Sequence, residues 1–242
     1  GSALLGEAPG SRPPLPRPSE AAPGPPRSLP SGKDSPHSPA TGTDTLYLEP
    51  WYEGALAGKR FVINAEGAPP RALDRGPLGL AGSSVNLRVA RYLDEYLTAA
   101  GAVVRQARQT EETPTDRDVV LLANRFRAGL YVELRYRGGP ADSASAVRSY
   151  FFPGSSRGLA AATALGSALA RTIGASAAPP GEMVTFPLQQ TSCPAVIVQP
   201  PGLRSVEEEL LLSESWYQRR QAYGIFGGIL NEGGVKNPAS LR

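Results

Sequence analysis

An unbroken apolar run near the C-terminal end limits most strongly what this chain can fold into. Residues 194–199 read PAVIVQ, with no charged side chain among them. A strand that alternates apolar and polar residues leaves one face to water, whereas a continuous apolar strand needs cover on both faces. Helices packed on both sides of a mainly parallel sheet give that cover, so the run predicts an α/β domain.

Shorter apolar stretches upstream of this run extend the pattern. The expected strands lie at 60–65, 102–109, 130–136 and 147–152. The expected helices begin at Ser83 or Ser84, at Thr113-Pro114, near Ser156 and after Ser205. Ser205 and Glu208 form a capping-box pattern, and the C-terminal helix is expected to break near Ser213. This order predicts one domain whose mainly parallel, twisted central sheet is flanked by helices.

Composition divides the chain into three parts. Between Gly1 and Ala40 there are 11 prolines and too few large apolar residues to offset the conformational entropy of folding. Residues 1–44 are therefore expected to be a disordered tether, 45–232 the α/β domain and 233–242 a C-terminal tail. A Pro-rich tether of this kind also suggests a signal or membrane anchor further upstream, which would hold the domain at a membrane.

Charge and hydropathy exclude two classes of partner. Lys and Arg number 25 against 22 Asp and Glu, for a net charge of +3, and the cations are scattered along the chain. No basic stripe forms, so no nucleic-acid partner is expected. No apolar stretch reaches the roughly 18 residues of a membrane span, so none is expected within this sequence. The segment GPLGL at 76–80 lacks the glycine spacing of a phosphate-binding motif and is interpreted as a plain loop.

Histidine and cysteine each occur once, which restricts the catalytic chemistry. His37 lies in the tether, so the folded part can form neither a Ser-His-Asp arrangement nor a histidine-ligated zinc site. Cys193 precedes a proline at the start of a buried strand, with no base to activate it. We interpret it as structural.

Acidic residues at strand ends are the remaining candidates for a site. Residues 61–70 read FVINAEGAPP, a strand that breaks into a turn whose one ionisable group is Glu66. Glu133 lies on a later strand, on the same face as Arg135. Parallel-sheet enzymes collect functional groups at the carboxyl ends of strands. Glu66 and Glu133 can therefore form a carboxylate-based site, or either can pair with Arg135.

Several segments together match the order of motifs in a known family. FVINAEGAPP is similar to an opening strand followed by D-P-G-H-G-G, and VNL at 85–87 to the helix start that follows it. LLANRFRAGLYVELRY at 121–136 is similar to a helix-strand passage containing S-I-H-A-N. PAVIVQ and the helical segment after Ser205 are similar to a closing strand and helix. The chain thus resembles the zinc-dependent N-acetylmuramoyl-L-alanine amidases of bacterial cell walls over about residues 60–230, which implies the amidase fold.

Carried over position by position, the resemblance implies that the zinc chemistry of this family is absent. The family's first histidine ligand falls on Gly67, its acidic ligand on Gly82 and its second histidine on Arg135. Its catalytic glutamate falls on Gln199. Two of these positions have no side chain, the third is a permanent cation, and an amide cannot transfer a proton. No zinc or other cofactor is therefore expected.

The resemblance implies an inactive, amidase-like domain of the bacterial cell envelope, periplasmic or otherwise extracytoplasmic. Its expected role is that of a scaffold, regulator or binding module in peptidoglycan remodelling or cell division. The expected partners are a cell-envelope protein and a peptidoglycan stem peptide. Arg135 and Gln199 can bind a carboxylate and an amide of that peptide, or the cleft is a vestige in which Arg135 pairs with Glu66 or Glu133. The alternative is a peptidoglycan hydrolase with a relocated site at Glu66 and Glu133.

Overall fold

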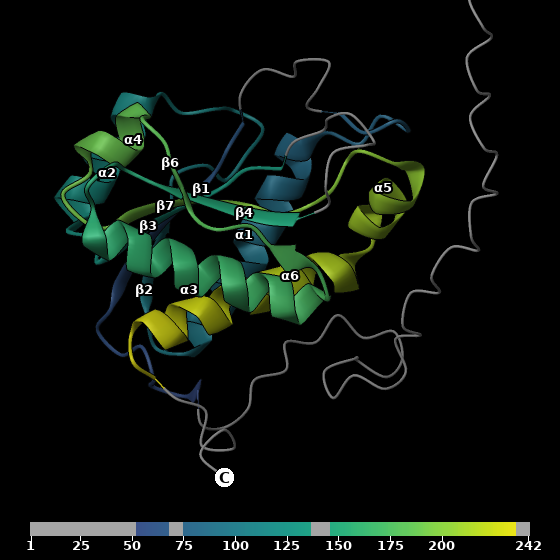
Figure 1. The fold of residues 1–242 in the computed structure, drawn as a ribbon. Helices are drawn as coiled ribbons and strands as arrows, with labels where there is room; N and C mark the ends of the chain where they lie inside the picture. The colour runs from purple at the N-terminus through teal and green to yellow at the C-terminus, as the bar shows by residue number, and fades with distance from the viewer. Residues whose placement is uncertain (1–51, 68–74, 137–145, 236–242) are drawn as a thin grey trace, which may run out of the picture. The chain divides into compact units, whose positions relative to one another are not determined.

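A computed structural model describes the chain at residues 52–67, 75–136 and 146–235 (Figure 1). The expected tether, with His37, lies outside the described residues. The expected tail is described only as far as Val235. No helix among the described residues is both long enough and apolar enough to cross a membrane.

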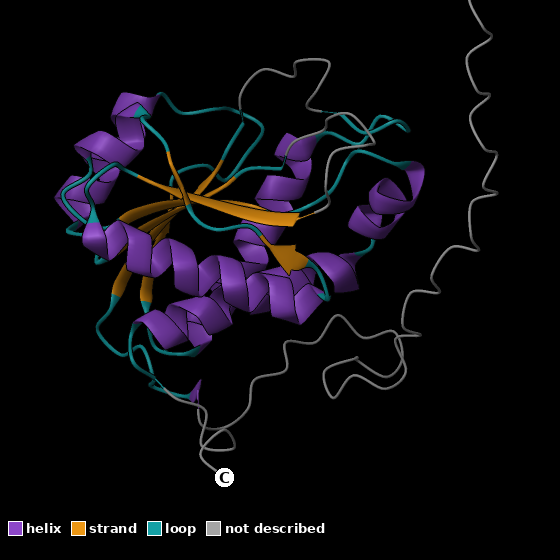
Figure 2. Cartoon of the chain, viewed as in Figure 1, coloured by secondary structure: helices purple, strands orange, loops and turns teal. Residues whose placement is uncertain are grey.

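The core of the fold is a seven-stranded sheet in the order β2-β1-β3-β7-β4-β5, with β6 also paired to β4 (Figure 2). The strands are β1 Arg60–Ala65, β2 Val103–Gln106, β3 Leu130–Leu134, β4 Ala146–Phe151, β5 Ser176–Ala177, β6 Gly181–Glu182 and β7 Ala195–Gln199. All pairs are parallel except β4 with β7, which is antiparallel. The expected mainly parallel sheet is confirmed.

Helices cover both faces of this sheet. They are α1 Gly82–Ala99, α2 Asp116–Phe126, α3 Ser156–Ile173, α4 Phe186–Gln190, α5 Val206–Ser213 and α6 Ser215–Glu232. On one face Ile63 and Val196 pack in a cluster with residues of α1, α3 and α6. On the other, Val62 and Ile197 pack with residues of α2 and α4. Neighbouring residues of one strand thus enter different cores, which explains why PAVIVQ is apolar without interruption.

Several element boundaries differ from the sequence-based expectation. α1 begins at Gly82 with Ala81 as its N-cap and no side-chain cap, because an antiparallel bridge between Arg75 and Ala81 already directs the chain into the helix. α2 is capped by Thr115, whose side chain accepts from the N–H of Asp118, and not by Thr113. The strands expected at 102–109 and 130–136 are shorter, and β5, β6 and α4 were not expected. The Ser205 cap and the helix break near Ser213 are confirmed.

Two glycines allow α6 to lie directly on α3. A Cβ at Gly228 would lie 2.5 Å from the Cα of Leu165, and a Cβ at Gly224 would lie 2.9 Å from the Cα of Leu169. Gly227 is in the same helix, but its Cβ position has no atom within 4 Å. The two helices can therefore make this contact only with glycine at positions 224 and 228.

This contact can be tested with two matched substitutions in α6. Gly228→Ala should lower the free energy of unfolding by about 1–3 kcal/mol, because the added methyl group overpacks the interface. Gly227→Ala should instead raise it by about 0.5–1 kcal/mol, because alanine loses less backbone entropy in a helix. Urea unfolding followed by circular dichroism measures both. Equal effects of the two substitutions would contradict the close approach.

Candidate functional site

The carboxyl ends of β1, β3 and β7 bring three of the predicted residues to one edge of the sheet. The N–H of Glu66 donates to the carbonyl of Leu134 at 3.0 Å. The N–H of Arg135 donates to the carbonyl of Val198 at 3.0 Å. Because Gln199 follows Val198, the residues Glu66, Arg135 and Gln199 leave neighbouring strands side by side.

Arg135 forms ion pairs with both candidate carboxylates. Its Nε lies 3.2 Å from Oε1 of Glu66, and its Nη2 lies 2.5 Å from Oε1 of Glu133. The Glu133 side chain is 4% exposed, whereas those of Glu66 and Arg135 are 16% and 17% exposed. The guanidinium thus connects a buried carboxylate to one near the surface. The sequence allowed Arg135 to pair with either acid, and in the structure it pairs with both.

The other carboxylate oxygen of Glu133 is also bound. Oε2 accepts from the hydroxyl of Tyr131 at 2.8 Å and from Nδ2 of Asn64 at 3.4 Å. Burial, followed by the charge of Glu133, raises the pKa of Tyr131 well above its usual value. The phenol therefore stays protonated and remains a donor. Such bonds compensate the cost of holding a carboxylate in the interior.

The balance of charge at Arg135 bears on what this edge can bind. Burial acts to lower the pKa of Arg135, but the charges of Glu133 and Glu66 together outweigh burial and raise it above its ordinary value. Arg135 is therefore a fixed cation. It is shared between two carboxylates, so it has no excess positive charge with which to attract the carboxylate of a ligand.

Removal of this cation should destabilise the domain strongly. Arg135→Gln should lower the free energy of unfolding by about 3 kcal/mol, because Glu133 would become a buried charge without a partner. The double variant Arg135→Gln/Glu133→Gln should recover part of that loss, since the buried charge is then gone. Arg117→Gln, at an exposed position on α2, should change stability by less than about 0.5 kcal/mol. Glu133→Gln alone completes the comparison. A loss of unfolding free energy in the double variant that equals the sum of the losses in Arg135→Gln and Glu133→Gln would contradict this account.

Gly82, at the start of α1, has no room for a side chain. A Cβ there would lie 2.6 Å from the carbonyl oxygen of Tyr136, a backbone atom. Asn86, one turn further along α1, keeps Gly82 close to the backbone of Tyr136. Its Nδ2 donates to the carbonyl of Glu66 at 2.7 Å, and its Oδ1 accepts from the N–H of Tyr136 at 2.9 Å. The first turn of α1 is thus held against the ends of β1 and β3.

Gly67 is similarly enclosed by side chains. A Cβ there would lie 2.6 Å from Nε of Arg108 and 2.6 Å from Oγ1 of Thr113. Both neighbours are held in place. The Thr113 hydroxyl donates to the carbonyl of Gly67 at 2.5 Å, and Nη1 of Arg108 donates to the carbonyl of Ser83 at 3.0 Å. A histidine at position 67 would have to displace both.

The remaining predicted residues, Gln199 and Cys193, lie at opposite ends of β7. Gln199 is half-buried at the end of β7, opposite Arg148 of β4. Cys193 is half-buried before β7, and burial raises the pKa of its thiol. A protonated thiol without an activating base is a poor nucleophile, which agrees with a structural role.

The zinc ion that the resemblance would imply does not fit these residues. No group of three or more His, Cys, Asp or Glu side chains that could hold a metal occurs within residues 52–67, 75–136 and 146–235. At the three predicted ligand positions the structure has two glycines with neighbours in the space of a side chain, and an arginine paired with two acids. A catalytic zinc needs three protein ligands and an open position, and these residues do not provide them.

Three residues that hold the loops around this site were not predicted from the sequence. They are Asn86, Arg108 and Glu209. Glu209, on α5, is 2% exposed, and its carboxylate accepts from the N–H groups of Leu78 and Leu80, each at 2.5 Å. The loop GPLGL therefore surrounds an anion, although that anion is a side chain of the same chain. The one sequence signal was an acidic residue in the first turns of a helix. Nothing in the sequence indicated which loop it binds.

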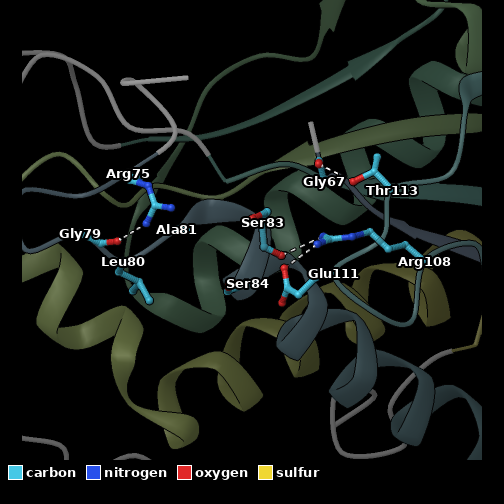
Figure 3. Close-up of a pocket in the computed structure, with 10 residues that line it drawn as sticks. All are labelled: Gly67, Arg75, Gly79, Leu80, Ala81, Ser83, Ser84, Arg108, Glu111 and Thr113. Carbon is cyan, nitrogen blue, oxygen red and sulfur yellow. Dashed lines mark hydrogen bonds and ion pairs between the residues drawn. The ribbon is translucent and has the colours of Figure 1, made fainter. Parts of the chain in front are cut away.

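A pocket of about 670 Å³ opens beside the first turn of α1 (Figure 3). Arg75 lines it from the loop that precedes α1, and Arg108 and Glu111 line it from the segment after β2. Gly67 and the first serines of α1, Ser83 and Ser84, complete the polar part of the wall. The pocket adjoins the predicted zinc positions, but its charged residues were not among those predicted.

Comparison with known proteins identifies what the chain is similar to. The family model described as N-acetylmuramoyl-L-alanine amidase matches residues 71–231. No match was found among curated protein sequences.

Solved structures share the fold at low sequence identity. The catalytic domain of the amidase CwlV from Bacillus (Paenibacillus) polymyxa var. colistinus has a TM-score of 0.65 at 22% identity, over 74% of this chain and 99% of that one. An N-acetylmuramoyl-L-alanine amidase from Clostridium difficile 630 has a TM-score of 0.67 at 19% identity, over 75% and 100%. The CwlD amidase from Clostridioides difficile, solved in complex with the GerS lipoprotein, has a TM-score of 0.63 at 17% identity, over 74% and 100%.

Proposed function

Because the chain belongs to the N-acetylmuramoyl-L-alanine amidase family, we propose that it is a member that has lost hydrolysis and acts by binding in the bacterial cell envelope. Its role is that of a scaffold or regulator in peptidoglycan remodelling or cell division. The observation that carries this proposal is the ion pairing of Arg135 with Glu66 and Glu133, at the position that matches the family's second histidine ligand.

The packing around the other ligand positions supports the same proposal. The backbone carbonyl of Tyr136 lies where a side chain at position 82 would begin, and Arg108 and Thr113 lie where one at position 67 would begin. Amidase chemistry of this kind relies on a metal to polarise the amide carbonyl and activate water. A chain that had merely lost its ligands would leave room for them, whereas here neighbouring groups fill that room.

The pairing of the two acids also argues against a relocated carboxylate site. A general base must be able to accept a proton from water within hydrogen-bond distance. Glu133 is 3% exposed and accepts bonds from Arg135 and Tyr131. Glu66 shares the same guanidinium. This geometry favours a structural ion-pair cluster over a hydrolytic pair.

The proposed partner is a protein of the cell envelope, at a periplasmic or extracytoplasmic location. CwlD, which shares this fold and was solved in complex with a lipoprotein, supports a protein partner. Peptidoglycan stem peptides are the second proposed ligand, because the family is named for cleavage at a muramoyl-alanine bond. A domain that binds such peptides without cleaving them can recruit or restrain active enzymes at the wall.

Metal analysis and a digestion assay test the loss of hydrolysis. The purified protein should contain far less than one zinc per chain by mass spectrometry after incubation with zinc and desalting. It should also release no stem peptide from purified sacculi in the presence of zinc. The C. difficile 630 amidase, assayed in parallel, provides the comparison. Stoichiometric zinc or released peptides would overturn the proposal.

Restoring the family's residues should not restore the site. A variant with Gly67→His, Gly82→Glu, Arg135→His and Gln199→Glu should lose at least about 3 kcal/mol of stability, because it combines overpacking with an unpaired Glu133. Thermal unfolding with and without zinc measures this. A variant that folds as well as the parent protein and is stabilised by zinc would show that the site had kept its room for the metal.

A further inference from the structure

The pocket beside α1 combines two arginines with one weakly held acid. Arg75 and Arg108 line it from different segments, and Glu111 lies next to Arg108 (Figure 3). Its volume of about 670 Å³ falls within the range of roughly 300–1,000 Å³ that is typical of small-ligand sites. Among the described lining residues, two guanidinium groups face one carboxylate, which is an excess of positive charge.

Arg108 is the buried member of the pair, and its hydrogen bonds are incompletely satisfied. Its side chain is 1% exposed, and Nη1 donates to the carbonyls of Ala65, Glu66 and Ser83 at 3.0–3.4 Å. Its Nε–H has no acceptor among the described residues, on the side of Gly67, which also lines the pocket. Burial lowers the pKa of Arg108, which the charge of Glu111 partly offsets. A buried guanidinium of this kind is stabilised by an acceptor that carries charge.

Among the described residues, Glu111 is the carboxylate paired with Arg108, and a ligand carboxylate can take its place. Oε2 of Glu111 lies 3.1 Å from Nη2 of Arg108, but the Glu111 side chain is 73% exposed. Exposed ion pairs contribute at most about 1 kcal/mol, because water screens them and the side chain loses entropy. The desolvation of Arg108 has already taken place in the free protein. A ligand carboxylate can therefore replace Glu111 at little cost.

Arg75, on the opposite wall, is held by a rigid loop. Its Nη1 donates to the carbonyl of Gly79 at 2.8 Å. The loop is fixed in turn by the buried carboxylate of Glu209, which accepts from the N–H groups of Leu78 and Leu80. A side chain placed in advance loses less entropy when it binds a ligand.

We propose that this pocket binds the carboxylate of a short peptide, held between Arg75 and Arg108, in exchange for Glu111. The inference rests on the proposed function, since a stem peptide of the cell wall is the carboxylate-bearing peptide that such a domain meets. This peptide site is distinct from Arg135, whose charge two acids already neutralise. The hydroxyls of Ser83 and Ser84, which line the same wall, suit the N–H and C=O groups of a peptide.

Two surface substitutions with opposite expected effects test the proposal. Glu111→Gln removes the carboxylate that competes with the peptide for Arg108. It should tighten peptide binding about two- to fivefold, which corresponds to the free energy of an exposed ion pair. Arg75→Gln removes one cation and should weaken peptide binding about ten- to a hundredfold, which corresponds to the loss of one hydrogen bond to a charged group. Both positions are exposed, so both variants should fold. Arg117→Gln, at an exposed position of α2 that does not line the pocket, should leave the affinity unchanged.

Isothermal titration calorimetry at low ionic strength provides the measurement, with a synthetic stem peptide as probe. The same peptide with its carboxylates amidated should not bind, and inorganic phosphate should bind more weakly than the peptide. Equal affinity for the acid and the amide, or weaker binding by Glu111→Gln, would overturn the proposal. Phosphate that binds as tightly as the peptide would overturn the assignment to a peptide carboxylate. The zinc and digestion assays do not involve Arg75, so loss of peptide binding alone would leave the non-catalytic role intact.

Discussion

A buried carboxylate in the centre of the sheet is the constraint on which the chemistry of this domain depends. Glu133 lies on β3, between β1 and β7, with 3% of its surface exposed. Charge at that depth must be compensated by an opposite charge and by hydrogen bonds. Arg135, directly after β3, supplies the charge, and Tyr131 of β3 supplies a hydrogen bond. The guanidinium that meets this need is a permanent cation, so it repels a metal ion at this edge of the sheet.

Buried polar side chains hold together the loops at this edge of the sheet. Asn86 joins the turn after β1 to the end of β3, and Arg108 joins that turn to the start of α1. Glu209 fixes the loop before α1 from α5, more than a hundred residues later in the chain. Each contact uses a buried polar side chain to bind backbone groups of a segment far away in the sequence. The result is a preorganised rim beside a pocket, which is what a binding domain requires.

The framework could be predicted because its signals are local. PAVIVQ had to be covered on both faces, and the structure places Val196 and Ile197 in different cores. The expected break near Ser213 is present between α5 and α6. The start of α1 was misplaced for a reason that is not local. Ala81 starts α1 without a side-chain cap because a bridge to Arg75 directs the chain there, and a contact between loops leaves no trace in helix-capping preferences.

The sequence by itself determined the class of fold and the lack of histidine in the folded part, and its resemblance to the family predicts that the zinc ligands are replaced at Gly67, Gly82 and Arg135. Each of these follows from the residues present and from their order. Only the tertiary structure decided that Arg135 pairs with Glu66 and Glu133 together, that position 82 has no room for a side chain, and that Arg108 faces a pocket. These facts depend on distances between segments far apart in the chain, which are set by how strands and helices pack and not by the residues of any one segment.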